Sequence, residues 1–226
     1  MITVKKDDTI KLALDSKIIN KSIHKNKYQM PNIENLMDSV GEHLACSTDK
    51  NAPAWFSSLD LKYAYSQLKL HPDTSKHCNF NIVGGRATGT YRFLTGFYGL
   101  TDMPAEFQKA IDNTLINLPN TFCFLDDILI ASRGTKEEHM ALVNACLKRI
   151  NDENLAISLK KCKIAVNEIE WLGYKIDSSG YKPLESKAAP LSNYRSQQRL
   201  ESLNNSWAPS NTWKNTLKAS QNCVHH

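Results

Sequence analysis

Two adjacent aspartates inside an apolar run constrain this chain more than any other feature. Asp126 and Asp127 stand between Phe124-Leu125 and Ile128-Leu129-Ile130. A carboxylate buried among apolar side chains is costly unless it is paired or binds a metal. Aspartate also favours tight turns. The segment therefore predicts a hairpin with both carboxylates at its tip, which forms either a hydrogen-bonded turn or part of a metal site.

A third aspartate favours the metal site. Asp60 ends another apolar segment, which begins at Phe56. If that strand lies beside the hairpin, Asp60 and Asp126 can share one site, whose hard oxygen ligands select Mg²⁺ or Mn²⁺. Two such ions about 4 Å apart suit in-line phosphoryl transfer, because one activates the attacking hydroxyl and the other neutralises the leaving pyrophosphate. The residues alone leave open whether the two strands adjoin.

Composition excludes several other classes of protein. The formal charge of the 226-residue chain is +5, and it is +2 without the four basic residues and one acid of residues 191–226, so net charge is weak evidence for a nucleic-acid partner. The chain has neither an 18-residue apolar run nor a recognisable secretory signal, so we expect an intracellular protein without a membrane partner, cytoplasmic or nuclear. The six cysteines form no Cys-x-x-Cys pair and are interpreted as reduced thiols.

Hydrophobic spacing predicts short strands that alternate with helices. Strands are expected at residues 2–4, 10–14, 55–61, 78–83, 90–94, 121–124, 128–132, 164–166 and 171–176, the last two as a pair. Helices are expected after Pro31, after Pro104 and from Thr135, the last with one face formed by Met140, Val143, Leu147 and Ile150. This order predicts an α+β fold with an antiparallel sheet backed by helices. Residues 191–226 contain six Ser and six Asn without an apolar period, and we expect them to be disordered.

Six segments occur in the order and spacing of one known family. They are residues 11–20 (KLALDSKIIN), 59–65 (LDLKYAY), 98–108 (YGLTDMPAEFQ), 124–127 (FLDD), 159–162 (LKKC) and 171–174 (WLGY). Over about residues 2–190 the chain resembles the reverse transcriptases of gypsy-type LTR retrotransposons and their retroviral relatives. The set of motifs in this order is stronger evidence than any single motif.

The resemblance implies a right-hand polymerase with palm and fingers. It places the fingers at residues 1–54 and 71–95, the palm at 55–70 and 96–182, and a divergent tail at 183–226. The implied activity is RNA-directed DNA polymerisation with an RNA or DNA template, a primer and deoxynucleoside triphosphates. The likeness ends near residue 190, before any thumb, connection or RNase H region. A thumb supplies many of the phosphate contacts that hold a primer–template, and without them the chain would release its substrate before useful extension. The alternative is therefore a catalytically inactive, nucleic-acid-binding remnant of a retrotransposon polyprotein. The oligomeric state is left open.

The resemblance also implies roles for individual residues. Asp60 and Asp126 would hold two Mg²⁺ or Mn²⁺ ions with the Leu61 carbonyl as a further ligand, and Asp127 would be the neighbouring acid. The other implied residues are Lys5 or Lys6 with Lys11 for the triphosphate, Tyr65 as a steric gate against ribonucleotides, Gly99 and Gln108 near the nucleotide, Lys160 or Lys161 as the general acid, and Trp171, Leu172, Gly173 and Tyr174 as the primer grip.

Overall fold

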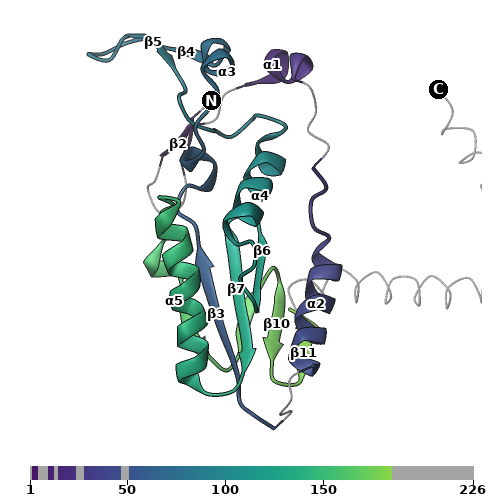
Figure 1. Ribbon diagram of the computed structural model, residues 1–226. Helices are drawn as coiled ribbons and strands as arrows, with labels where there is room; N and C mark the ends of the chain where they lie inside the picture. The colour runs from purple at the N-terminus through teal and green to yellow at the C-terminus, as the bar shows by residue number, and fades with distance from the viewer. Residues whose placement is uncertain (1, 5–9, 13–14, 24–27, 47–50, 185–226) are drawn as a thin grey trace, which may run out of the picture. The chain divides into compact units, whose positions relative to one another are not determined.

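The computed structural model describes residues 2–4, 10–12, 15–23, 28–46 and 51–184 (Figure 1). The predicted disorder at 191–226 therefore lies outside the described residues. In chain order the elements are β1 (Ile2–Val4), β2 (Ile10–Leu12), α1 (Lys17–Ser22), α2 (Ile33–Ala45), β3 (Ala54–Asp60), η1 (Ala64–Gln67), α3 (Pro72–His77), β4 (Asn79–Ile82), β5 (Gly89–Arg92), α4 (Met103–Thr114), β6 (Thr121–Phe124), β7 (Asp127–Arg133), α5 (Lys136–Asp152), η2 (Leu159–Lys161), β8 (Lys163–Val166), β9 (Ile169–Trp171), β10 (Tyr174–Asp177) and β11 (Gly180–Pro183).

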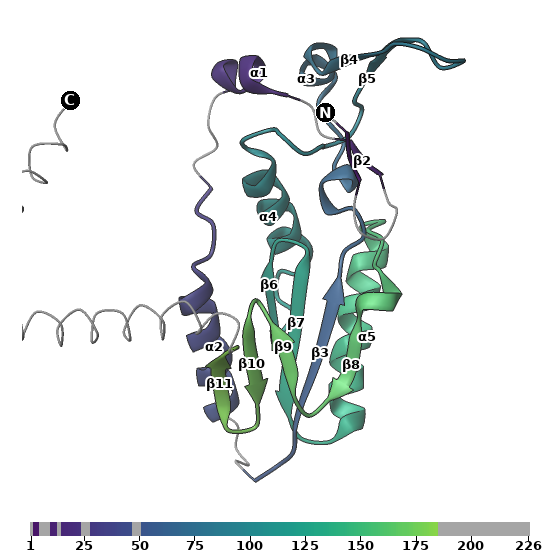
Figure 2. The same ribbon diagram turned by 180° about the vertical axis from the view of Figure 1, so that it is seen from behind.

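A four-stranded antiparallel sheet in the order β6-β7-β3-β8 forms the centre of the fold. Strand β7 shows why its sequence is continuously apolar. Ile128 and Ile130 pack against α4 and α5 on one face, whereas Leu129 and Ala131 pack against α2 and the β9–β10 hairpin on the other (Figures 1 and 2). A strand covered on both faces buries every side chain, so its sequence loses the alternation of a half-exposed strand. The predicted α+β class is confirmed, with a layer on each face of the sheet.

The strand pairing of residues 163–177 differs from the prediction. Strand β8 pairs with β3 and not with the segment after it. The segment 171–176 contains a turn, and Trp171 pairs with Tyr174 across it in the β9–β10 hairpin. Positive φ angles at Leu172 (48°) and Gly173 (79°) identify a type I′ turn, which suits the twist of two antiparallel strands. The hydrophobic pattern concealed this turn because Leu172 is apolar.

The buried face of α5 was also predicted slightly out of phase. Thr135 and Glu138 form the expected capping box, but the buried positions are His139, Val143, Cys146 and Ile150. Met140 and Leu147 are half-buried beside them. The first of these buried positions is a polar histidine, which a search for apolar periodicity does not count, so the buried face was predicted from the wrong residues.

His139 of α5 forms a buried polar bridge between strands β3 and β7 of the central sheet. Its Nε2 lies 2.7 Å from the Ser57 hydroxyl of β3 and its Nδ1 lies 2.7 Å from the Ser132 hydroxyl of β7. Ser57 Oγ also accepts from the Ala165 N–H at 2.9 Å, so its own proton is free to be donated to Nε2. Ala165 has a φ of 51°, and the bridge therefore joins α5 to the irregular start of the β3–β8 pairing.

We expect this bridge to make the fold sensitive to acid. Burial lowers the pKa of His139, so the folded chain binds fewer protons there than the unfolded chain. The stabilising contribution is complete above the unfolded value of about 6.5 and is lost as the pH falls through the lowered folded pKa. Urea denaturation at pH 7.5 and at pH 5.5 would measure the unfolding free energy of each protein. The decrease from pH 7.5 to pH 5.5 should be smaller for His139→Gln than for the wild type. Equal decreases would contradict this assignment.

The remaining strands form small separate sheets. The predicted hairpins β1–β2 and β4–β5 are both present, and β4–β5 extends away from the central sheet (Figure 1). Cys78, Phe97, Leu100 and Met103 form a third apolar cluster, against which Ile19, Leu68 and Phe93 pack. The described cysteines have free thiols: Cys46, Cys78, Cys123, Cys146 and Cys162. Within the described ranges, every helix is too short or too polar to cross a membrane.

Candidate active site

The central sheet brings the three aspartates together. Strands β3 and β7 are antiparallel neighbours, and Asp60 stands directly opposite Asp127 at one end of the pair. The Leu61 N–H donates to the Asp126 carbonyl at 2.9 Å, so the residues that follow β3 touch the turn before β7. Directly opposed residues in an antiparallel pair have Cα atoms about 4.5–5.5 Å apart and side chains on the same face. The prediction that these strands adjoin is confirmed.

The turn that carries Asp126 is strained. Phe124 pairs with Asp127, which leaves Leu125 and Asp126 as a two-residue turn. Leu125 has a φ of 54°, the sign that a type II′ turn requires at its first central residue. Glycine usually occupies that position, and a side chain there costs roughly 1–3 kcal/mol. The turn therefore needs contacts from outside the hairpin.

Gln108 of α4 supplies that support. Its Oε1 accepts from the Leu125 N–H at 2.7 Å, and its Nε2 donates to the Cys123 carbonyl at 3.3 Å. Cys123 Sγ donates to the Leu125 carbonyl at 3.3 Å. The Gln108 side chain is 0% exposed and holds the turn from the core side. Its predicted place near the nucleotide stays a prediction.

Lys161 is the lysine that reaches the aspartates. Its Nζ lies 3.1 and 2.9 Å from the two carboxylate oxygens of Asp60. The hydrogen bond to Asp60 raises the pKa of Lys161, so the ammonium keeps its proton. Within the described part of the chain, Lys160 forms no ion pair. Of the two lysines that the sequence left open, Lys161 is therefore the one that contacts Asp60, and its role as the general acid stays a prediction.

The carboxylates repel one another. Burial, followed by the charges of Asp126 and Asp60, raises the pKa of Asp127, and the nearby Lys161 opposes this shift. Three carboxylates at one sheet end are the oxygen donors that Mg²⁺ and Mn²⁺ prefer, so their chemistry fits the expected ions. Among the described residues, however, no three side chains already surround one ion position.

We expect the ionised Asp127 to reduce stability. A raised folded pKa means that folding disfavours the charged form, and the penalty is present above the folded pKa and disappears as the pH falls below the unfolded value of about 3.9. In a chelator at pH 7.5, Asp127→Asn should raise the melting temperature by about 2–4 °C, the shift for roughly 1 kcal/mol in a domain of this size. Asp152→Asn, at an exposed helical ion pair, is the control. A lower melting temperature for Asp127→Asn would refute the repulsion.

Tyr65 belongs to an aromatic group with Tyr98 and Phe107. It is half-buried in η1, and its ring centroid is 5.2 Å from that of Tyr98 and 5.8 Å from that of Phe107. Gly96 makes this packing possible, since a Cβ at Gly96 would lie 2.4 Å from the Tyr65 carbonyl oxygen and 2.4 Å from the Met103 sulfur. No sequence pattern indicated that a glycine is needed at position 96, because a close backbone approach is a property of the tertiary structure.

Gly99 is held by a residue that the sequence analysis did not identify. Its φ is 117°, a conformation that favours glycine. The Asn20 side chain of α1 donates to the Gly99 carbonyl at 2.8 Å and accepts from the Thr101 N–H at 3.1 Å. A single asparagine from a distant helix thus sets the loop that leads into α4.

Gln67 similarly fixes the segment before Lys161. Its Nε2 donates to the Lys62 carbonyl at 2.6 Å, and its Oε1 accepts from the Ala156 N–H at 2.6 Å. The Ser158 N–H donates to the Asp60 carbonyl at 2.8 Å. These bonds bring the start of η2 to the end of β3, which explains how Lys161 reaches a carboxylate 101 positions earlier.

The predicted primer-grip residues form the β9–β10 hairpin. Trp171 is 4% exposed and belongs to the core between α2 and the sheet. Leu172, Gly173 and Tyr174 are half-buried at the turn. A hairpin is confirmed, and contact with a primer stays a prediction.

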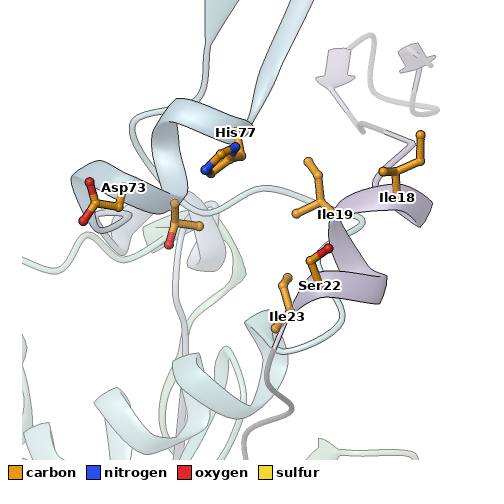
Figure 3. A pocket seen from close by; sticks show the side chains of 7 residues that line it. Ile18, Ile19, Ser22, Ile23, Asp73 and His77 are labelled. Atoms are coloured by element: carbon orange, nitrogen blue, oxygen red, sulfur yellow. The ribbon is translucent and has the colours of Figure 1, made fainter.

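The predicted triphosphate lysines are not tested. Lys5 and Lys6 lie outside the described residues, and Lys11 pairs with Thr3 in the backbone of the β1–β2 hairpin. A cavity of about 630 Å³ lies elsewhere, between α1 and α3 (Figure 3). It contains none of the predicted site residues and is lined by Ile18, Ile19, Ser22, Ile23, Asp73, Thr74 and His77.

Comparison with known proteins gives one consistent answer. The family model for reverse transcriptase (RNA-dependent DNA polymerase) matches residues 4–176. An enzymatic polyprotein of Soybean chlorotic mottle virus is 31% identical over 171 residues, which cover 75% of this chain and 23% of the viral protein. The transposon Tf2-3 polyprotein of Schizosaccharomyces pombe is 26% identical over 205 residues, which cover 90% of this chain and 14% of that protein.

Solved structures share the fold. The foamy viral protease-reverse transcriptase dRH in complex with double-stranded DNA aligns with a TM-score of 0.70 and 20% identity, over 85% of this chain and 31% of that chain. The foamy viral protease-reverse transcriptase in complex with an RNA/DNA hybrid aligns with a TM-score of 0.64 and 21% identity, over 85% and 24%. The chain thus spans less than a third of each of these proteins.

Proposed function

The chain belongs to the reverse transcriptase family, and from that premise we propose that it adds deoxynucleotides to the 3′ end of a primer on an RNA or DNA template. The observation that supports this most strongly is the register of β3 and β7, which sets Asp60 opposite Asp127 next to Asp126. We assign residues 55–70 and 96–182 to the palm, and residues 1–54 and 71–95 to the fingers. The DNA and RNA/DNA complexes of the foamy viral proteins support a nucleic-acid partner.

Asp60 and Asp126, with the Leu61 carbonyl, would hold two Mg²⁺ or Mn²⁺ ions. When bound, such ions supply charge neutralisation for an attacking hydroxyl and a leaving pyrophosphate. Asp127 adds negative charge beside them and so strengthens cation binding. Burial and then the charges of Asp126 and Asp60 raise the pKa of Asp127, and a bound cation would relieve the repulsion between these carboxylates.

Lys161 would hold the proton that the pyrophosphate takes on leaving. Its ammonium is the acid nearest to the carboxylates among the described residues, and it is exposed enough to move from Asp60 to a substrate. Tyr65 would place its ring against the sugar, where a 2′-hydroxyl clashes and a deoxyribose does not. The Gly99 loop would lie near the new base pair, and Lys5 or Lys6 with Lys11 would bind the triphosphate.

Primer extension tests the proposal directly. The full chain is incubated with a labelled primer on an RNA template and on a DNA template, with deoxynucleotides and either Mg²⁺ or Mn²⁺. We expect extension on both templates that stops when a chelator is added. Extension by the wild type but not by aspartate variants supports the proposal, and extension that survives loss of the aspartates refutes it.

Nucleic-acid binding without catalysis is the second candidate. Residues 74–101 contain no Asp or Glu, and Arg86 and Arg92 are exposed there. An acid-free exposed region favours the phosphate backbone. This candidate predicts salt-sensitive binding of a primer–template without extension under either metal.

A further inference from the structure

We propose that Tyr28 and Asp112 are positioning residues for the turn that carries Asp126, and that they act through Gln108. Their effect on turnover rests on the proposed polymerase function, whereas their effect on the turn itself does not. Neither residue belongs to the sequence motifs quoted above as catalytic. Tyr28 lies in the extended segment that leads into α2, and Asp112 lies in α4.

Four groups form a continuous chain of hydrogen bonds. The Tyr28 hydroxyl donates to Asp112 Oδ2. Gln108 Nε2 donates to Asp112 Oδ1 at 2.9 Å, and Gln108 Oε1 accepts from the Leu125 N–H at 2.7 Å. Tyr28 and Gln108 both donate to Asp112, and Leu125 donates to Gln108, so every bond pairs one donor with one acceptor.

Asp112 determines which way the Gln108 amide faces. A glutamine amide can rotate by 180° and exchange its oxygen and nitrogen. In the rotated state the Gln108 NH₂ would face the Leu125 N–H, donor against donor, and its oxygen would face the Asp112 carboxylate, acceptor against acceptor. Both contacts would be lost in a site where Gln108 is 0% exposed and water cannot replace them. An acceptor at Asp112 therefore keeps Oε1 directed at the turn.

Tyr28 in turn holds Asp112. A hydroxyl that donates to a carboxylate forms a charge-assisted bond, which is stronger than a neutral one. That bond and burial raise the pKa of Tyr28 to about 12, so the phenol keeps its proton at any physiological pH. Asp112 is half-buried in α4, where a fixed donor restricts its rotamer.

The consequence lies at Leu125. Its positive φ is unfavourable for a leucine, and the hydrogen bond that its N–H donates to Gln108 offsets part of that cost. A loosened Gln108 would let the turn relax and would move Asp126 away from Asp60. The segment that contains Tyr28 runs beside α4 (Figure 1), and Tyr28 is 84 positions from Asp112 in the sequence. A residue outside the quoted motifs thus supports the geometry of the turn that carries Asp126.

Tyr28→Phe tests the proposal because it removes one hydroxyl and little volume. The chain offers a matched control, Tyr181→Phe, since the Tyr181 hydroxyl donates to Asp38 of α2, away from the turn. Amide exchange of Leu125 is measured by NMR on the full chain without metal. We expect exchange of the Leu125 amide to become about fivefold faster in Tyr28→Phe, which is the effect expected for one lost hydrogen bond. Exchange should be unchanged in Tyr181→Phe.

A second measurement reports on Asp126. The concentration of Mn²⁺ that half-saturates the protein, followed by electron paramagnetic resonance of the free ion, should rise about fivefold in Tyr28→Phe only. Unchanged Leu125 exchange in Tyr28→Phe, or equal acceleration across the whole core in both variants, would overturn the proposal. If the wild type neither binds Mn²⁺ nor extends a primer, the proposed function fails, and Leu125 exchange alone still decides whether the positioning role is correct.

Discussion

Asp126→Asn should reduce primer extension by about 10³-fold, the effect of about 4 kcal/mol of lost transition-state stabilisation. The amide keeps the size of the side chain and one oxygen but carries no charge. The turn itself should survive, because the contacts that hold it reach Leu125 and not the Asp126 side chain. The loss would be measured as the steady-state rate of primer extension at saturating deoxynucleotide, with the Mg²⁺ concentration varied about tenfold.

Two controls separate this loss from unfolding. Asp152→Asn removes another aspartate at an exposed ion pair in α5 and should extend primers at the wild-type rate. The melting temperature of Asp126→Asn should be no lower than that of the wild type, because the variant removes a like charge next to Asp127. Extension by Asp126→Asn within tenfold of the wild type would exclude Asp126 as a metal ligand.

Lys161→Ala should slow nucleotide addition by about 10²-fold, the lower end of the contribution of a general acid. The ammonium holds its proton through Asp60 and is the candidate donor to pyrophosphate. Lys160→Ala is the matched control, because it removes the adjacent lysine of η2 and should change the rate less than twofold. Single-turnover kinetics would measure the step without product release.

Lys161→Arg separates proton donation from charge. Arginine keeps the positive charge beside Asp60 but does not give up a proton at neutral pH. If Lys161 is the acid, the arginine variant should be nearly as slow as the alanine variant. A rate close to that of the wild type would instead show that the charge alone matters, and equal losses in Lys160→Ala and Lys161→Ala would remove the assignment altogether.

The sequence was most informative where chemistry conflicts with packing. Carboxylates inside apolar strands are costly without a partner, so Asp126 and Asp127 already indicated a hairpin tip. The sequence left open whether the strand that ends at Asp60 lies beside this hairpin, and the register of β3 and β7 shows that it does. The capping signal was reliable, since Thr135 and Glu138 act within one helical turn and need no distant partner.

Patterns were least informative where a polar residue serves the core. His139 and Gln108 are both 0% exposed and fully hydrogen-bonded, yet a hydrophobicity pattern counts them as surface. The pairing of β8 with β3 was missed for a related reason. Neighbouring strands in the sequence usually pair, and nothing in residues 164–166 states which edge they will join.

The sequence by itself determined the family, the α+β class and the identity of the three aspartates, because these depend on residue types at fixed spacings along the chain. The tertiary structure alone decided that Lys161 and not Lys160 meets Asp60, that Gln108 holds the turn, and that Tyr28 reaches it through Asp112. Each of these is a hydrogen bond between residues distant in the chain. Such a bond depends on a separation of about 3 Å between two side chains, and a linear order of residues does not contain that separation.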